Sequence, residues 1–175
     1  MRKNRPNWQL ALLLLPLLFG SCAGTVKTVG YANKNVPNYK NAYIISAEYS
    51  QYIEFPGILY NGVSYIVLPD GPAKEHKKIG NTDIVIKKEL EKYGIHAEIG
   101  KKGDALEGFD LIVEYYDTWR DDLKKVLDKL EIVFISPTGE LIAKSTYNMK
   151  ELHNYPTPEK EVANMIKELL EAKPE

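Results

Sequence analysis

The stretch LEIVFISPTGELIAKSTY (residues 130–147) holds two apolar runs separated by a short polar segment. Leu130 to Ile135 has the composition of a buried strand, and Glu140 to Tyr147 is a second run rich in strand-forming residues. Between them, Ser136 to Gly139 combines Pro and Gly as a β-turn does. This stretch therefore predicts an antiparallel hairpin within a larger sheet.

A longer strand is predicted just upstream, in FDLIVEYYDTW (residues 109–119). Successive side chains of a strand point to opposite faces of the sheet, so the sequence separates into two sets. One face would carry Leu111, Val113, Tyr115, Asp117 and Trp119, and the other Ile112, Glu114, Tyr116, Thr118 and Arg120.

Further strands are indicated nearer the N-terminus. Residues 42–47 are rich in strand formers, residues 49–55 alternate between apolar and polar, and residues 95–99 alternate again before Gly100. Asn61-Gly62 lies between two apolar runs and predicts a tight two-residue hairpin turn, because both turn positions of that hairpin need positive φ.

Two segments have the period of an amphipathic helix. Residues 81–93 carry apolar side chains three and four residues apart and are followed by Gly94, which favours a helix end. Thr157 can cap a second helix with Pro158 at its first position. Together these elements predict a two-layer α+β domain over residues 42–175, with a mixed or mostly antiparallel sheet of about five or six strands and two helices.

The N-terminus has the three-part pattern of a secretory signal. A basic head, residues 1–5, precedes an apolar run from Trp8 to Phe19 and then the small residues Gly20 and Ser21. The apolar run is about a dozen residues long, whereas a membrane-spanning helix needs roughly 20. We therefore expect residues 1–21 to be a cleaved signal peptide.

The residues around Cys22 resemble the lipobox of bacterial lipoproteins, in which small residues precede an obligatory cysteine. Cys22 is the only cysteine in the chain, and acylation would anchor an exported protein while removing a free thiol. The resemblance implies lipidation of Cys22, a polar tether over residues 22–41, and, because Ala23 stands where Asp would retain the protein on the inner membrane, an outer-membrane position facing the periplasm.

Composition excludes some partners. The chain has 23 Lys and Arg against 24 Asp and Glu, and removing the three basic residues of the predicted signal lowers the formal net charge from −1 to −4. A basic footprint for nucleic acid is absent. Arg120 is the only arginine after Cys22, which does not favour phosphate binding. No motif for nucleophilic hydrolysis, phosphate binding or zinc is present, so we expect no cofactor, no metal and no catalytic residue identifiable from a motif.

Residues 114–122 are the densest cluster of functional side chains, with three aromatic residues, one arginine and three aspartates. Three interpretations stay open. The first is structural, with the aromatic rings packed on the sheet and Arg120 paired with a carboxylate. The second is a partner-binding surface, because Tyr, Trp and Arg are enriched at interface hot spots. The third is a carboxylate site for a cation or for acid–base chemistry. The candidate partner-binding residues are Tyr115, Asp117, Trp119 and Arg120.

The stretch from Asp110 to Tyr147 resembles small envelope lipoproteins of unknown function. This resemblance implies an envelope domain and lends no catalytic residues. The leading hypothesis is a lipid-anchored binding or assembly module whose partner is an envelope protein or cell-wall glycan. The alternatives are a carboxylate-dependent envelope hydrolase or glycan-active enzyme using Glu114, Asp117 or Asp121, and a small-ligand binder.

The lipid anchor is tested by growing cells with a palmitate analogue. We expect the wild type to incorporate the label and Cys22→Ala to remain unlabelled, because no other residue of the chain matches an acylation site. Label of equal intensity in both proteins would contradict the lipidation of Cys22.

Overall fold

The computed structural model describes residues 25–30, 39–104, 106–121, 124–149 and 157–171. The predicted signal peptide and Cys22 lie outside the described residues. The described strands are β1 (Thr25–Gly30), β2 (Asn41–Ile45), β3 (Tyr49–Ile53), β4 (Ile58–Tyr60), β5 (Tyr65–Val67), β6 (Lys74–Lys77), β7 (His96–Gly100), β8 (Leu111–Asp121), β9 (Lys125–Ile135) and β10 (Leu141–Asn148), and the described helices are α2 (Thr82–Lys92) and α3 (Pro158–Glu171).

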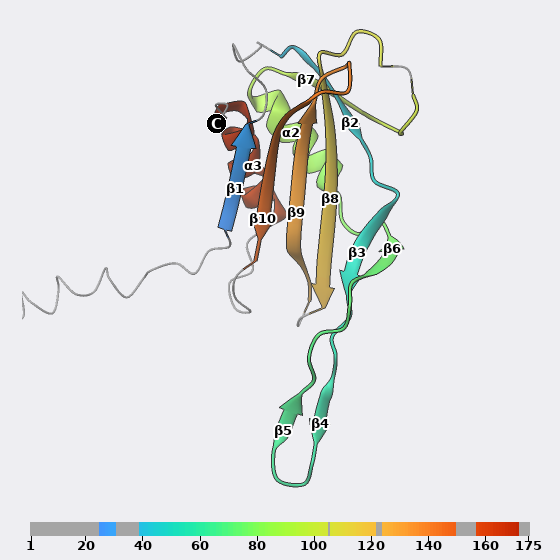
Figure 1. Cartoon of the computed structure of the whole chain (residues 1–175), viewed down its shortest axis with the longest axis vertical. Coiled ribbons are helices and arrows are strands. Elements are labelled where there is room, and N and C mark those ends of the chain that lie inside the picture. The colour runs from blue at the N-terminus through green and yellow to red at the C-terminus, as the bar shows by residue number, and fades with distance from the viewer. Residues whose placement is uncertain (1–24, 31–38, 105, 122–123, 150–156, 172–175) are drawn as a thin grey trace, which may run out of the picture.

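Eight of the described strands form one mixed sheet (Figure 1). Its main order is β1-β10-β9-β8-β2-β7, in which β8, β9, β10 and β1 are antiparallel neighbours. On its other side β8 pairs in parallel first with β2 and then, further along, with β3, whose outer edge carries β6. Strands β4 and β5 pair only with each other.

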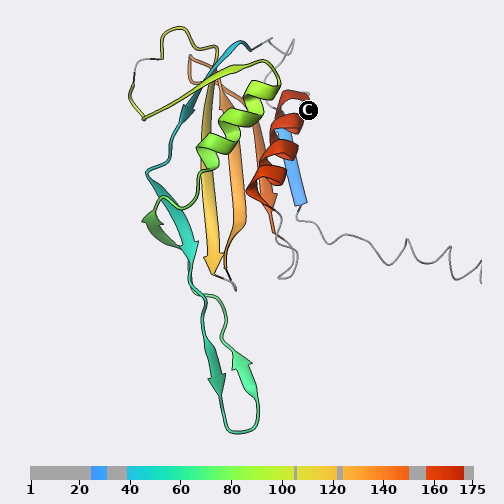
Figure 2. The same ribbon diagram turned by 180° about the vertical axis from the view of Figure 1, so that it is seen from behind.

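Helices α2 and α3 cover one face of this sheet (Figure 2). The strand residues that face them are buried, as the alternating burial of β8 shows. Helix α3 contributes an apolar stripe to the same core, and its first turn is capped by Thr157, whose hydroxyl accepts a hydrogen bond from the Lys160 N–H at 3.4 Å. Among the described residues, no helix is long and apolar enough to cross a membrane. The largest fully buried side chains include Tyr147, Phe134, Ile44, Ile86, Leu90, Leu111, Leu130, Ile132, Met165 and Ile166.

The two predicted helices and the mixed, strand-rich body are confirmed, and the alternating faces predicted for residues 111–119 are present. The predicted number of strands is too low, because the main sheet has eight. Strand β1 lies within residues 22–41, where we predicted a tether, and only two of its six residues are larger apolar ones. Strand β6, Lys-Glu-His-Lys, has none. Both strands are held by backbone hydrogen bonds to a neighbouring strand. Such bonds require no particular side chains, so the sequence of these strands shows no hydrophobic period.

The two predicted hairpins have different outcomes. Strands β9 and β10 are joined at Ser136 to Glu140 as expected, although β9 begins at Lys125, five residues earlier than predicted. Strands β4 and β5 also form a hairpin, but Tyr60 pairs with Tyr65, so the turn has four residues and not two. Asn61 does not adopt positive φ. Its side-chain oxygen accepts hydrogen bonds from the backbone N–H groups of Val63 and Ser64.

Trp119 ties the end of β8 to the start of α2. Its indole N–H donates to Asp117 Oδ2 at 3.0 Å, and the Thr82 hydroxyl donates to the same oxygen at 3.0 Å. The indole lies against Gly80, where a Cβ atom would approach the ring to 2.7 Å. Gly80 also has φ +74°, so glycine is required there both by conformation and by the close approach of the ring.

Gly80→Ala should destabilise the fold more than Gly139→Ala. Both glycines have positive φ, but a Cβ at Gly139 would meet nothing within 4 Å. We expect about 1 kcal/mol for the conformational strain at Gly139 and about 2–4 kcal/mol at Gly80, where the overlap with Trp119 adds to it. Urea unfolding monitored by tryptophan fluorescence measures both. Equal losses would show that the indole moves aside without cost.

Candidate functional site

The sheet is interrupted where β2 gives way to β3. Strand β2 pairs with β8 up to Val113, and β3 resumes the pairing at Thr118. Between these points the chain from Ser46 to Glu48 leaves the sheet, so Glu114 to Asp117 have no strand partner on that side, although β9 pairs with them on the other. Backbone N–H and C=O groups of this segment face the interruption, where side chains, water or a ligand can satisfy them.

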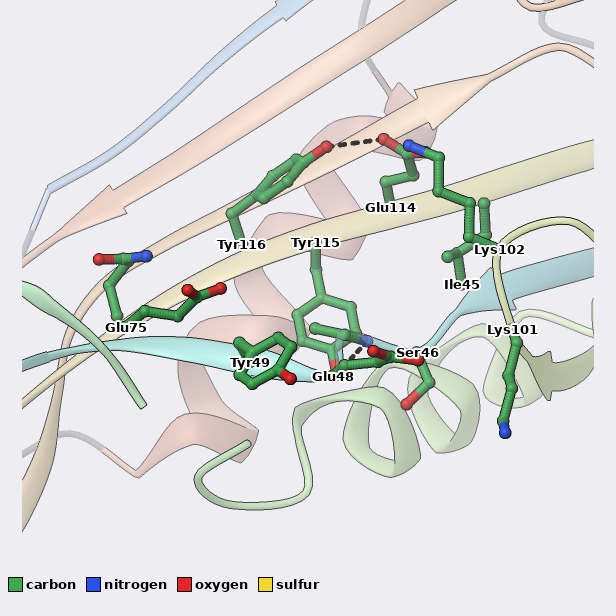
Figure 3. Close-up of a pocket in the computed structure, with 12 residues that line it drawn as sticks. Ile45, Ser46, Glu48, Tyr49, Glu75, Lys101, Lys102, Glu114, Tyr115 and Tyr116 are labelled. Carbon is green, nitrogen blue, oxygen red and sulfur yellow. Dashed lines mark hydrogen bonds between the residues drawn. The ribbon is translucent and has the colours of Figure 1, made fainter. Parts of the chain in front are cut away.

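A hollow of about 610 Å³ lies over this interruption. Figure 3 shows Tyr115 projecting from β8 toward the chain at Ser46 and Glu48, whereas Tyr116 and Glu114 project to the other side of the strand. Its lining combines aromatic rings with carboxylates, an amide and lysines from segments distant in the sequence. The lining residues are Ile45, Ser46, Ala47, Glu48, Tyr49, Gln51, Glu75, Lys101, Lys102, Glu114, Tyr115 and Tyr116.

The three tyrosines of the hollow are held differently. Tyr115 is buried, and its hydroxyl accepts a hydrogen bond from the Ala47 N–H at 3.3 Å; burial, and then the charge of Asp83, raises its pKa to about 12. Tyr116 is 56% exposed and donates its hydroxyl proton to Glu114 Oε2 at 2.8 Å, a bond that raises its pKa. Tyr49 is 57% exposed. Tyr49 and Tyr116 therefore offer aromatic surface to a ligand, whereas Tyr115 forms part of the wall.

A polar cluster lies where the hollow meets the start of α2. Ser46 Oγ donates to Asp83 Oδ2 at 2.8 Å and accepts from Lys78 Nζ at 3.1 Å, and Lys78 also forms an ion pair with Asp83. Burial raises the pKa of Asp83, but the hydrogen bonds from Lys78 and Ser46 outweigh it, so the net pKa is lowered. Because Lys78 donates to Ser46 and the Ser46 proton points to Asp83, this arrangement is the opposite of a lysine base activating a serine.

The residues we proposed for partner binding lie mostly in the core. Tyr115, Asp117 and Trp119 are buried, and the bonds of Asp117 with Trp119 and with Thr82 hold β8 against α2. Arg120 forms ion pairs with Asp70 at 2.9 Å and Asp128 at 3.0 Å. These contacts match the structural interpretation of the cluster, including the expected pairing of Arg120 with a carboxylate.

The carboxylates considered for catalysis are separated from one another. Glu114 lies at the hollow beside Tyr116, Asp117 lies in the core, and Asp121 is at the end of β8, where its hydrogen bond raises the pKa of Tyr52 to about 12. In the described part of the chain, no three His, Cys, Asp or Glu residues are grouped so that they could hold a metal ion. His76 packs against Tyr52, His96 lies near Glu98, and His153 lies outside the described residues.

Sequence reasoning did not select Tyr49, Glu48 and Glu75 as site residues. They come from separate segments that meet only in the folded sheet. The available signal was compositional, because seven tyrosines fall between Tyr31 and Tyr65. That signal could not separate the tyrosine at the hollow from those of the β4–β5 hairpin.

Comparison with known proteins gives only distant structural similarity. No protein-family model matches the chain, and neither does any curated protein. Two structures of the PelC dodecamer from Paraburkholderia phytofirmans are similar at 12% identity, with TM-scores of 0.48 and 0.45; the similarity covers 86% of this chain and 98% and 99% of theirs. A PDZ domain protein from Parabacteroides distasonis is similar at 12% identity and TM-score 0.45, over 94% of this chain and 40% of its own length. Similarity at this level assigns neither a family nor a function.

Asp83→Asn should destabilise the fold by about 1–2 kcal/mol at pH 7, because Lys78 would lose its counter-charge in a partly buried position. The folded pKa of Asp83 is lowered from 3.8, so its contribution is complete well above that value and fades as the pH falls below it. Denaturant unfolding at several pH values should therefore show the two proteins converging in acid.

The control for this measurement is the same substitution in a Lys78→Met background. There the effect of Asp83→Asn should be smaller, because the cation that needs the carboxylate is gone. A loss that is independent of pH and of Lys78 would assign the effect to packing and not to the ion pair.

Proposed function

We propose that this chain is a lipid-anchored module of the cell envelope that binds another envelope component and performs no catalysis. The acyl chains on Cys22 hold it to the outer membrane, facing the periplasm. The observation that supports binding is the hollow at the sheet interruption, where two half-exposed tyrosines stand among carboxylates and lysines. Among the envelope components, a cell-wall glycan fits this lining best.

A glycan needs two kinds of contact at once. The faces of its sugar rings are apolar and pack on aromatic rings, and its hydroxyl groups need hydrogen-bond donors and acceptors. Tyr49 and Tyr116 supply the rings, and Gln51 and Glu114 supply polar groups. Three glutamates and two lysines line the hollow, so their formal charges nearly cancel, which suits a ligand without a dense charge.

The hydrolase alternative has less support in the geometry. Glycoside hydrolysis uses two carboxyl groups that flank the scissile bond, one acting as the acid. Glu114 and Asp117 belong to opposite faces of β8, and Asp117 is buried and bonded to Thr82 and Trp119. Within the described residues, the glutamates of the hollow do not converge closely enough to share a metal ion. Retention of a glycan without cleavage is the activity these positions favour.

Co-sedimentation with purified peptidoglycan tests this function. We expect the detergent-solubilised full chain to sediment with peptidoglycan, and the double variant Tyr49→Ala/Tyr116→Ala to bind about tenfold more weakly, since each aromatic contact contributes about 0.5–1.5 kcal/mol. Tyr93→Ala is the matched control, because Tyr93 is also about half exposed but lies outside the hollow.

Two outcomes would contradict the assignment. One is a wild type that stays in the supernatant at every protein concentration tested. The other is an equal loss in Tyr93→Ala, which would show that tyrosines anywhere on the surface contribute. Release of soluble sugar fragments from the peptidoglycan would favour the hydrolase alternative.

A further inference from the structure

A β-hairpin arm, residues 55–69, projects from the body beyond the end of β8 (Figure 1). Its sequence, FPGILYNGVSYIVLP, contains no charged residue. It holds strands β4 and β5, which pair with each other and with no other described strand. The nearest charged residues lie at the root of the arm, where Glu54 forms an ion pair with Lys74 and Asp70 forms one with Arg120.

The apolar side chains of the arm are exposed on both of its faces and at its tip. Ile58, opposite Val67, and Tyr60, opposite Tyr65, share one face, and the pair of Leu59 and Ile66 lies on the other. Val63, in the turn, is 91% exposed. The full set, exposed between 47% and 91%, is Phe55, Ile58, Leu59, Tyr60, Val63, Tyr65, Ile66 and Val67.

Such an arm needs an apolar environment around it. An isolated two-stranded hairpin is marginally stable in water, and exposed apolar patches of this kind mark interaction sites. A flat protein partner would cover one face and leave the other in water. Apolar side chains on both faces and at the tip fit a medium that surrounds the arm.

Two hollows on the body of a second copy carry several charged residues, which do not suit the arm. A more apolar hollow, lined by Phe55, Pro56, Leu68 and Pro69 among others, lies at the root of the arm itself. The hollow at the sheet interruption combines tyrosines with three glutamates and two lysines. A second cavity, of about 470 Å³ between β1 and α3, is lined by Lys160, Glu161, Lys167, Glu168 and Glu171 among others. Burying uncharged apolar side chains against these groups would desolvate the charges without pairing them.

The position of the chain that leads to Cys22 identifies the surrounding medium. Cys22 precedes Thr25, the first residue of β1, by three residues, which span at most about 10 Å. Thr25 pairs with Asn148, and along the neighbouring strands this level of the sheet continues through Lys129 to Thr118. Arg120, two residues further on, pairs with Ile53, after which the arm begins. The residue nearest the predicted lipid and the root of the arm therefore lie at the same end of the sheet (Figures 1 and 2).

We infer that the arm inserts into the interface of the lipid bilayer that holds the acyl chains of Cys22. This inference rests on the lipid anchor of the proposed function and adds a second membrane contact. Insertion stays shallow, about 5–10 Å, because the outer edges of β4 and β5 leave backbone groups that hydrocarbon cannot satisfy. Tyr60 and Tyr65, whose ring centroids lie 4.9 Å apart, flank the turn at the tip. The Tyr60 hydroxyl donates to the Gly62 carbonyl at 3.0 Å, so two polar groups of the tip satisfy each other and lower the cost of insertion.

A fluorescent probe on the arm tests the depth of insertion. Cys22 is the only cysteine, so in the acylated full chain Val63→Cys provides a single free thiol for a nitrobenzoxadiazole label. The labelled protein is reconstituted into vesicles of phosphatidylethanolamine and phosphatidylglycerol that contain lipids with a nitroxide on the acyl chain. We expect the nitroxide lipids to quench the label at Val63, and iodide in the water to have little effect.

The matched control is Thr138→Cys, an exposed turn residue at the opposite end of the sheet. Its label should be quenched by iodide and not by the lipids. A third variant adds Leu59→Ser and Ile66→Ser to Val63→Cys. Both side chains are about half exposed, so the fold is retained, and the quenching at Val63 should fall by about tenfold because the apolar area available for insertion is smaller.

The outcomes separate this inference from the anchor on which it rests. Labelling of the wild type by the thiol reagent would show that Cys22 is not acylated and would overturn the anchor. With the anchor intact, a label at Val63 that is quenched by iodide and not by nitroxide lipids would overturn insertion of the arm. So would a disulfide-linked dimer formed by unlabelled Val63→Cys on the vesicles, which would assign the arm to a second copy of the chain.

Discussion

Strand β8 is the constraint on which the rest of the structure depends. It is hydrogen-bonded to β9 along one side and to β2 and β3, in succession, along the other. The side chains on one face of β8 pack toward the layer formed by α2 and α3. Asp117 accepts hydrogen bonds from both Trp119 and Thr82, which fixes the start of α2 against β8. Because one strand serves both halves of the sheet, β2 and β3 need not be continuous with each other. The separation between them follows from this arrangement.

Because β2 and β3 are separated, the middle of β8 forms one wall of the hollow. Where β2 or β3 pairs with β8, backbone hydrogen bonds close that edge of β8. Where they part, Tyr115 closes most of the gap with its ring and hydroxyl, and Tyr116 and Glu114 stay open to solvent on the face without helices. The Ser46, Lys78 and Asp83 cluster holds the displaced chain at the start of α2. The hollow is thus walled by β8 on one side and by non-strand segments, Ser46 to Glu48 and Lys101 to Lys102, on the other.

The sequence predicts elements that bury apolar side chains periodically and misses those that do not. The two-residue period of β8 and the three- and four-residue steps of the helices follow directly from burial against one core. Strands β1 and β6 lack that signal, because backbone pairing holds them. The parallel pairing of β2 with β8 joins residues about seventy apart, and no local pattern encodes it. The hollow depends on that pairing, so its residues could not be grouped from the sequence. The β4–β5 hairpin was predictable from Asn61-Gly62, whereas the absence of a protein layer over it was not.

The proposed lipid on Cys22 and the proposed insertion of the arm would together have a geometric consequence that neither has alone. A tether of three residues alone would hold the domain near a bilayer and leave its orientation free. The tether would enter at β1, at one edge of the sheet, whereas the arm leaves from β3, across β10, β9 and β8. Two membrane contacts separated by several strand spacings of about 4.8 Å would restrict rotation about the tether. The turn between β9 and β10 would then point away from the membrane, and the hollow, midway along β8, would open at a fixed height above it. An orientation held in this way would present the proposed glycan site to the cell wall, which lies on the periplasmic side of an outer-membrane anchor.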